Sequence, residues 1–336
     1  MSRFILKRLA LLLAMLVGLL AITFTVSHVA PGDPASLAAG PDASPQMVQQ
    51  IRQEFGLDRS LPEQLWIYVR GVLHGNLGRS VRTSHQVLDD LEVFFPATFE
   101  LVTVAMLIAI LFGLPLGVLA AVRQNGWIDH LARVVSVSGV AVPMFWLGIM
   151  LQLIIALNLG WLPLGGRLGL MTDPPATITG LYLIDSLLHG DGSAFRDALA
   201  HIILPAMALS LPALASIMRV NRAEMIEALG QDYIVNARAQ GIAPLRTVAV
   251  YALKNAMLPT LAIIGLRYGW MLGGTVLVES VFDWPGIGLY ATQSAIAQDF
   301  QPIMGVTLLI GINFMLANLI VDLAYGLLDP RSRVTA

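Results

Sequence analysis

Six long apolar segments constrain the fold of this chain more than any other feature of its sequence. They cover approximately residues 9–30, 97–122, 131–157, 198–218, 258–278 and 304–327. A helix needs about 20 apolar residues to cross a bilayer core of about 30 Å, and each segment reaches that length. Composition agrees, because only 12% of the 336 residues are charged, against roughly 25% in a soluble domain. We therefore expect an all-α integral membrane protein with six transmembrane helices.

The first apolar segment could instead be a cleaved signal peptide, since Arg3, Lys7 and Arg8 precede it as in such leaders. Its apolar run is longer than theirs, however, and His28 occupies a position where cleavage requires a small residue. We expect an uncleaved helix.

Basic residues in short loops predict the orientation of the chain. Basic residues precede the first segment and follow the last one (Arg331 and Arg333). They also flank the loop between the second and third segments (Arg123 and Arg133), and five of them lie in the loop 219–254. With six spans all these positions lie on one side, which we expect to be the cytoplasm, so both termini are cytoplasmic. The predicted organisation is a first transmembrane helix (1–30), a small external helical cap (31–96) and a five-helix core (97–336) that contains the cytoplasmic loop 219–254.

The loop 219–254 is much longer than a simple turn between two spans requires. Asp232 can cap a short helix over 233–240, and Gly241 can end that helix in the left-handed conformation. Pro244 suits the first position of a following helix that continues into the fifth span. Since a two-turn helix is marginal by itself, we expect it to insert into a groove on a partner protein.

The sequence lacks the motifs that are typical of several classes of enzyme and binding protein. The chain has no cysteine and no GxxxxGKS, GxxxxGKT, GxSxG or HExxH motif, and its six histidines are scattered. We therefore expect no bound metal, no ATP site and no cysteine nucleophile in this chain. A net charge of −2 gives no indication of a nucleic-acid partner.

The loop 219–254 resembles the signature loop of the dipeptide/oligopeptide/nickel family of ABC-transporter permease subunits. The similarity rests on EALGQDYI at 227–234, ARAQG at 237–241 and LKNAMLP at 253–259, and on further stretches in the family's order, among them PMFW at 143–146, GWLP at 160–163 and ESVFDWPGIG at 279–288. Two departures from the general importer pattern, around Asn236 and Lys254, are shared with the peptide-importer branch. The chain is most similar to the first (B-type) permease subunit of the dipeptide importer.

This resemblance implies a type I ABC importer permease bundle in a bacterial inner membrane, with dipeptides or short peptides as substrate. The implied partners are a second homologous permease (a heterodimer), two ATP-binding subunits that hold ATP and Mg, an extracytoplasmic substrate-binding protein and membrane lipid. Nickel chelates, longer oligopeptides and peptide conjugates remain alternative substrates. An intramembrane enzyme or an autonomous channel is disfavoured, because the spans carry no reactive cluster and few charges.

Three groups of candidate functional residues follow. The first forms the coupling helix on which an ATP-binding subunit would dock: Gly230, Asp232, Tyr233, Ile234, Ala237, Arg238, Ala239 and Gly241. The second comprises Arg267 and Asp322, intramembrane charges that either line the translocation path or pair with each other, while Arg267 could also snorkel. The third is an outer gate or docking rim, with a helix-capping turn as the alternative: Glu279, Phe282, Trp284, Pro285 and Gly286.

Overall fold

The computed structural model describes residues 11, 14–25, 34–39, 43–54, 56 and 58–328. Within these ranges the chain is helical, with one isolated bridge between Arg79 and Gln86 and no β-strand. The helices are α2 (Pro34–Ala39), α3 (Pro45–Glu54), α4 (Leu61–Leu73), α5 (Val87–Val122), α6 (Trp127–Ala141), α7 (Met144–Leu151), α8 (Tyr182–Leu188), α9 (Gly192–Leu229), α10 (Asp232–Ala239), α11 (Pro244–Arg246), α12 (Leu253–Phe282), α13 (Ile287–Ile296) and α14 (Phe300–Leu328), with π-helical η1 (Gln152–Asn158) and η2 (Thr247–Ala252).

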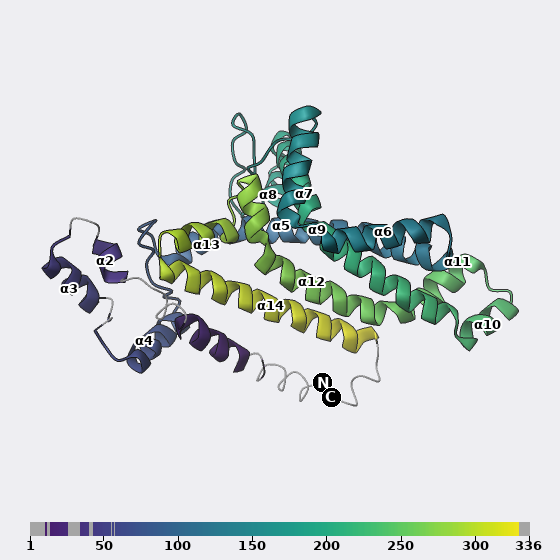
Figure 1. The fold of residues 1–336 in the computed structure, drawn as a ribbon, viewed down its shortest axis with the longest axis horizontal. Helices are drawn as coiled ribbons and strands as arrows, with labels where there is room; N and C mark the ends of the chain where they lie inside the picture. Colours follow the sequence, from purple (N-terminus) through teal and green to yellow (C-terminus); the bar gives the residue numbers. More distant parts are fainter. Residues whose placement is uncertain are drawn as a thin grey trace.

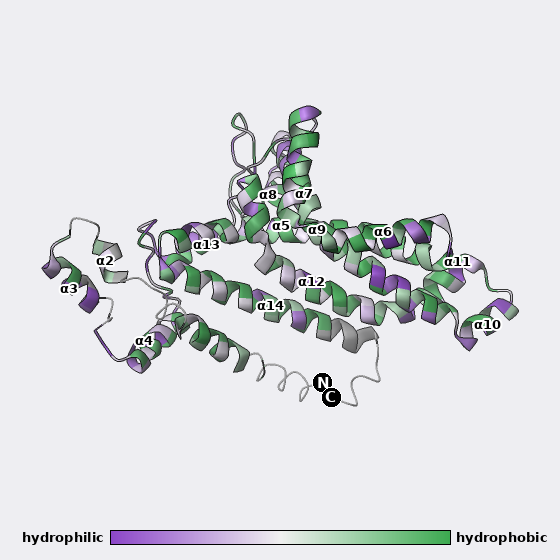
Figure 2. Ribbon diagram, in the orientation of Figure 1, coloured by the Kyte–Doolittle hydropathy of each residue, from purple (hydrophilic) through white to green (hydrophobic). Residues whose placement is uncertain are grey.

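Four long apolar helices confirm four of the predicted spans. They are α5, α9, the continuous run Pro244–Phe282 through α11, η2 and α12, and α14. These helices lie along the long axis of the molecule, and apolar residues dominate most of their length (Figures 1 and 2). Both α5 and α9 extend beyond the apolar segments that predicted them. Of the first predicted span, the described residues include an apolar helix, Ala14–Thr25; the preceding basic residues and the residues after 328 lie outside the described ranges.

The third predicted span is broken into two helices. Trp127–Ala141 and Met144–Asn158 meet at an angle of 106°, and α7 stands across the direction of the bundle (Figure 1). The break falls at Pro143, whose ring disfavours the helical conformation of the preceding residue; Val142 is extended, with φ −79° and ψ 123°. Pro115, Pro205 and Pro212 by contrast lie inside continuous helices.

The predicted external cap and the predicted coupling loop lie at opposite ends of the long axis (Figure 1). At one end are α2, α3 and α4, where Tyr68 and Val72 of α4 pack in a cluster with Leu20 of the first apolar helix. At the other end is α10. Residues 87–96, the last part of the predicted cap, belong to α5.

The centre of the bundle is a close contact between α5 and α9. A Cβ atom at Gly117 of α5 would lie 2.9 Å from the carbonyl oxygen of Met218 and 2.9 Å from Oδ1 of Asn221, so only glycine fits there. Small residues let membrane helices approach each other in this way. The buried apolar core around this contact also includes residues of α12, among them Met271, Leu272 and Val278.

Candidate functional site

The short helix predicted in the loop 219–254 is present as α10, Asp232–Ala239. Gln231, not Asp232, is its N-cap residue, and Asp232 is its first helical residue, where a carboxylate still interacts favourably with the helix dipole. Gly241 follows the helix with a φ of +73°, and Pro244 begins α11, as predicted. The sequence therefore predicts this element to within one residue.

The two faces of α10 have different surroundings. Ile234 is fully buried and Ala237 is 4% exposed, and both face inward because residues three apart share one side of a helix. They pack in an inner cluster with Met225, Ala228, Ala252 and Ala256, members of α9, η2 and α12. Ile234 and Ala237 therefore lie on the side of α10 that packs against the rest of the chain. The exposed side of α10 presents Tyr233, Val235, Arg238 and Ala239, and a docking role for the helix stays a prediction.

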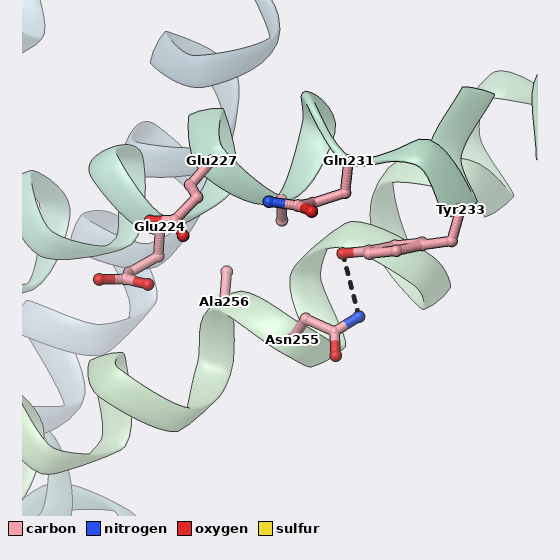
Figure 3. A pocket seen from close by; sticks show the side chains of 7 residues that line it. Glu224, Glu227, Gln231, Tyr233, Asn255 and Ala256 are labelled. Carbon is pink, nitrogen blue, oxygen red and sulfur yellow. Dashed lines mark hydrogen bonds between the residues drawn. The ribbon is translucent and has the colours of Figure 1, made fainter.

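An open pocket lies beside α10 (Figure 3). Its volume is about 250 Å³, and its lining combines two carboxylates with neutral polar groups: Glu224, Glu227, Ala228, Gln231, Tyr233, Asn255 and Ala256. The amide nitrogen Nδ2 of Asn255 donates a hydrogen bond of 3.2 Å to the Tyr233 hydroxyl across one wall. Glu224 and Glu227 are not among the predicted site residues, although the spacing of Glu224, Glu227 and Gln231 places them on one face of α9 and its C-terminal turn. The acidic lining suits a cationic side chain.

The two predicted intramembrane charges belong to helices that pack on each other. Arg267 is in α12 and Asp322 in α14; Val321, next to Asp322 in sequence, lies against Gly265 of α12. The Nε atom of Arg267 is buried and has no hydrogen-bond partner among the described residues. The side chain of Asp322 is outside the described residues, so both its pairing with Arg267 and a role in the path stay predictions.

Of the five residues predicted as an outer gate, all except the exposed Pro285 are packed into a junction of α5, α12 and α13, which we call the outer junction. Glu279 is fully buried and accepts hydrogen bonds from Thr98 Oγ1 (2.7 Å) and from the backbone nitrogen of Leu289 (2.8 Å). Trp284, 1% exposed, donates from Nε1 to the carbonyl oxygen of Ala97 at 2.9 Å. Gly286 is the N-cap residue of α13.

These contacts fit the alternative of a helix-capping turn. Asp283 ends α12 in the left-handed conformation, with a φ of 48°. Glu279 and Thr98 accept hydrogen bonds from backbone nitrogens in the first turn of α13, which have no partner within their own helix. Phe282, also 1% exposed, belongs to the same core. A gating role for these five residues stays a prediction.

A buried ion pair next to the outer junction was not predicted. Arg167 Nη2 lies 2.6 Å from Glu100 Oε2, with side chains that are 7% and 5% exposed. The same guanidinium donates to the carbonyl oxygen of Gly180 at 3.0 Å and lies 3.6 Å from the ring centroid of Tyr182. Glu100 stands inside an apolar segment, which is itself a signal for a buried partner. No sequence pattern singles out Arg167 as that partner, because the loop from 159 to 181 has no regular periodicity.

Another buried carboxylate, Asp185, holds the loop that precedes α8. It accepts hydrogen bonds from the backbone nitrogens of Ile178, Thr179 and Gly180 and from the Thr179 hydroxyl. Burial acts to raise the pKa of Asp185, but these hydrogen bonds outweigh it and hold the pKa below its usual value. Together with Arg167, which donates to the carbonyl oxygen of Gly180, Asp185 therefore fixes residues 178–180 of the loop before α8.

A further buried carboxylate joins α6 to α9 toward the α10 end of the bundle. Asp129, fully buried, lies 2.8 Å from Nη2 of Arg222 and 2.9 Å from Nη2 of Arg133. Its Oδ2 also accepts from the backbone nitrogen of Asn125 at 2.9 Å. The carboxylate is thus fully partnered and serves the packing of the two helices. Among the described residues, no group of three or more His, Asp or Glu side chains could hold a metal ion.

Comparison with known proteins assigns the chain to a family. Residues 113–334 match the family "binding-protein-dependent transport system inner membrane component", and residues 1–102 match its N-terminal component. The chain is 46% identical over 320 residues to the probable D,D-dipeptide transport system permease protein DdpB of Escherichia coli K12, covering 95% of this chain and 94% of the relative. It is 40% identical over 336 residues to the dipeptide transport system permease protein DppB of the same strain, covering 99% of each.

The fold also agrees with a solved structure. The inward-facing MetNI methionine ABC transporter matches with a TM-score of 0.51 at 17% identity, covering 69% of this chain and 93% of that chain. Together with the similarity along the full chain, this confirms the predicted family and the type I importer fold. The chain belongs to the binding-protein-dependent transport system inner membrane components and is a multi-pass permease subunit of the peptide-type branch of ABC importers.

Proposed function

We propose that this chain is one of two permease subunits of an importer for dipeptides and other short peptides. The observation that carries this proposal is similarity along the full chain to two permeases named for D,D-dipeptide and dipeptide transport. The subunit forms half of the translocation path and hydrolyses no ATP itself.

The assembly we propose contains a second homologous permease, two ATP-binding subunits that hold ATP and Mg, and a substrate-binding protein outside the membrane. The separation of the cap and α10 to opposite ends of the bundle supports this arrangement (Figure 1). The binding protein would meet the cap end, and the ATP-binding subunits would meet α10. Because the basic loops include the one that carries α10, we place this end and both termini in the cytoplasm.

The α10 end has the features of a docking surface. Tyr233, Val235 and Arg238 are exposed there, while the inner face of the helix is fixed by burial of Ile234. The adjacent pocket presents Glu224 and Glu227 (Figure 3), which can pair with a basic side chain of an ATP-binding subunit. We therefore assign docking to the outer face of α10 together with this acidic pocket.

The substrate proposal is tested by uptake in cells that lack the chromosomal copy of this subunit. Labelled dipeptide, D,D-dipeptide, pentapeptide and nickel–histidine chelate are each supplied to the deletion strain and to the complemented strain. We expect complementation to restore uptake of the two dipeptides and to leave nickel uptake unchanged. Restored nickel or pentapeptide uptake with no change in dipeptide uptake would assign the subunit to one of the alternative substrates.

A further inference from the structure

We propose that Arg219 of α9 and Arg267 of α12 together form a cationic site on the translocation path, and that this site binds the C-terminal carboxylate of the transported peptide. The inference rests on the proposed import of short peptides. It adds to that function the chemical group of the substrate that the membrane part of this subunit recognises.

The two arginines come from helices that pack on each other (Figure 1). The helices α9 and α12 are joined at one level by a hydrogen bond of 3.3 Å from Nδ2 of Asn221 to Oγ1 of Thr260. Arg219 precedes Asn221 by two residues, and Arg267 follows Thr260 by about two turns. Because the helices run in opposite directions, both arginines lie on the cap side of this hydrogen bond. They are close enough for the charge of Arg219 to act on Arg267.

Neither arginine has an acidic partner among the described residues. Arg222, one turn further along α9, is by contrast bound by the carboxylate of Asp129. The buried Nε of Arg267 also has no hydrogen-bond acceptor in the described part of the chain. Two neighbouring cations in a membrane protein are unfavourable unless an anion neutralises them. The pair therefore forms a site for an anion that the described residues do not supply.

The pair lies beside a face of α12 that this chain leaves uncovered. The exposed residues of this face recur every three or four positions, and we call them the open face of α12: Ala262, Leu266, Trp270, Gly273 and Leu277. Arg267 is half-buried at the edge of the open face, and Arg219 is itself exposed. Charged side chains within membrane spans face protein or a water-filled cavity, not lipid. We therefore assign the open face of α12 to the path through which the substrate passes.

A carboxylate is the anion that the site would meet in a peptide importer. Every dipeptide ends in a carboxylate, whatever its side chains are. A guanidinium group donates two parallel hydrogen bonds to a carboxylate, and guanidinium groups from two helices can approach it from two sides. A site for this group serves all short peptides alike, because their side chains take no part in the contact.

The absence of cysteine from the chain allows the charge of the site to be measured directly. Trp270→Cys places a single thiol on the open face of α12, one turn from Arg267. Its rates of reaction with an anionic and a cationic methanethiosulfonate reagent are compared in the purified importer. We expect the anionic reagent to react faster, and this preference to fall severalfold on Arg219→Gln or Arg267→Gln.

The matched control for this measurement is Arg123→Gln. Arg123 is exposed at the end of α5 and belongs to neither helix of the pair, so its loss should leave the preference unchanged. A thiol that reacts with neither reagent would show that the open face is not lined by water. That result, or a preference that is insensitive to Arg219 and Arg267, would overturn the proposal.

The ligand is tested with two substrates that differ only in the carboxylate. Alanyl-alanine and its C-terminal amide are each supplied to the reconstituted importer at concentrations that saturate the binding protein. Arg219→Gln and Arg267→Gln should each lower the uptake rate of the free acid about tenfold, because each removes a charged hydrogen-bond donor to the carboxylate. Neither variant should change the uptake rate of the amide. Arg267→Lys, which keeps the charge, should recover part of the rate for the free acid.

These readouts separate the inference from the proposed function. An equal loss of acid and amide uptake in the glutamine variants would overturn the inference and leave peptide import intact. The arginines would then serve assembly, through Asp322 or an acidic residue of the second permease. An unsubstituted importer that takes up neither compound would instead refute the proposed peptide import, and the inference with it.

Discussion

Two buried carboxylates of this subunit are paired with arginine side chains. Glu100 is partnered by Arg167 and the backbone nitrogen of Leu183 near the outer junction, and Asp129 by Arg222 and Arg133 on the α10 side. Removing one member of such a set leaves the other buried without a partner, which costs far more than the intact pair contributes. The function of these residues is therefore to fix helix positions, and their loss should affect folding before transport.

The pair Glu100–Arg167 allows this to be measured. Glu100→Gln should lower the free energy of unfolding by about 3–5 kcal/mol, because Arg167 remains buried and charged. Adding Arg167→Met should recover part of the loss, since the unpaired charge is then gone. Glu92→Gln is the matched control, because Glu92 is exposed on the same helix and should change stability by less than about 0.5 kcal/mol. Thermal unfolding of the purified importer gives the comparison, and a similar loss in both glutamine variants would contradict the assignment.

The sequence predicts the conformation of residues that shape their own turn of backbone. It does not predict the partners of residues whose role depends on contacts with distant parts of the chain. Gly241 and Pro244 act within their own turns, so their predicted conformations are confirmed. The sequence does not show that Ile234, and not the equally apolar Val235, faces inward, because a helix of two turns gives too short a pattern to decide which side is buried. Arg167 and Glu100 are 67 residues apart, and only the folded chain brings them together.

At the scale of elements, α12 connects the two ends of the subunit. Its start lies against α10 through Ala256 and the rest of the inner cluster, and its end carries Glu279 and Phe282 of the outer junction. One continuous helix therefore spans the distance between the proposed docking surface and the buried contacts at the cap side. A sequence pattern predicts each of these helices, but the contact of α10 with α12 arises from packing and was not foreseen.

Docking on the outer face of α10 is tested by reversing one exposed charge. Arg238→Glu, in the last turn of α10, should strongly reduce co-purification of the ATP-binding subunits and abolish transport. The helix itself should lose only about 0.3–1 kcal/mol from the unfavourable interaction of an anion with its C-terminal dipole. Arg196→Glu is the matched control, because Arg196 is exposed near the opposite end of α9. Equal co-purification with both variants would remove α10 from the docking surface.

At the scale of the whole molecule, length and hydropathy predict where most membrane helices lie but not how each one runs. Four predicted spans are confirmed as long helices. The third was predicted from the same apolar signal, yet it turns by 106° at Pro143. Proline marks where a helix can break, but the direction of α7 depends on its packing against α9 and α12, which no local pattern encodes. The bend places the segment between α7 and α8 beside the bundle (Figure 1).

The proposed orientation of the molecule rests on the charges of its loops, and the absence of cysteine from the chain allows it to be tested. Met171, fully exposed in the segment between α7 and α8, should be on the outer side, and Gln124, exposed between α5 and α6, should be cytoplasmic. In spheroplasts, a membrane-impermeant maleimide should therefore label Met171→Cys at once and label Gln124→Cys only after permeabilisation. The unsubstituted chain, which should take up no label, is the control. Because Arg123 and Arg133 flank Gln124, the reverse labelling pattern would mean that loop charges do not set the orientation here, and α10 would then lie where no ATP-binding subunit could reach it.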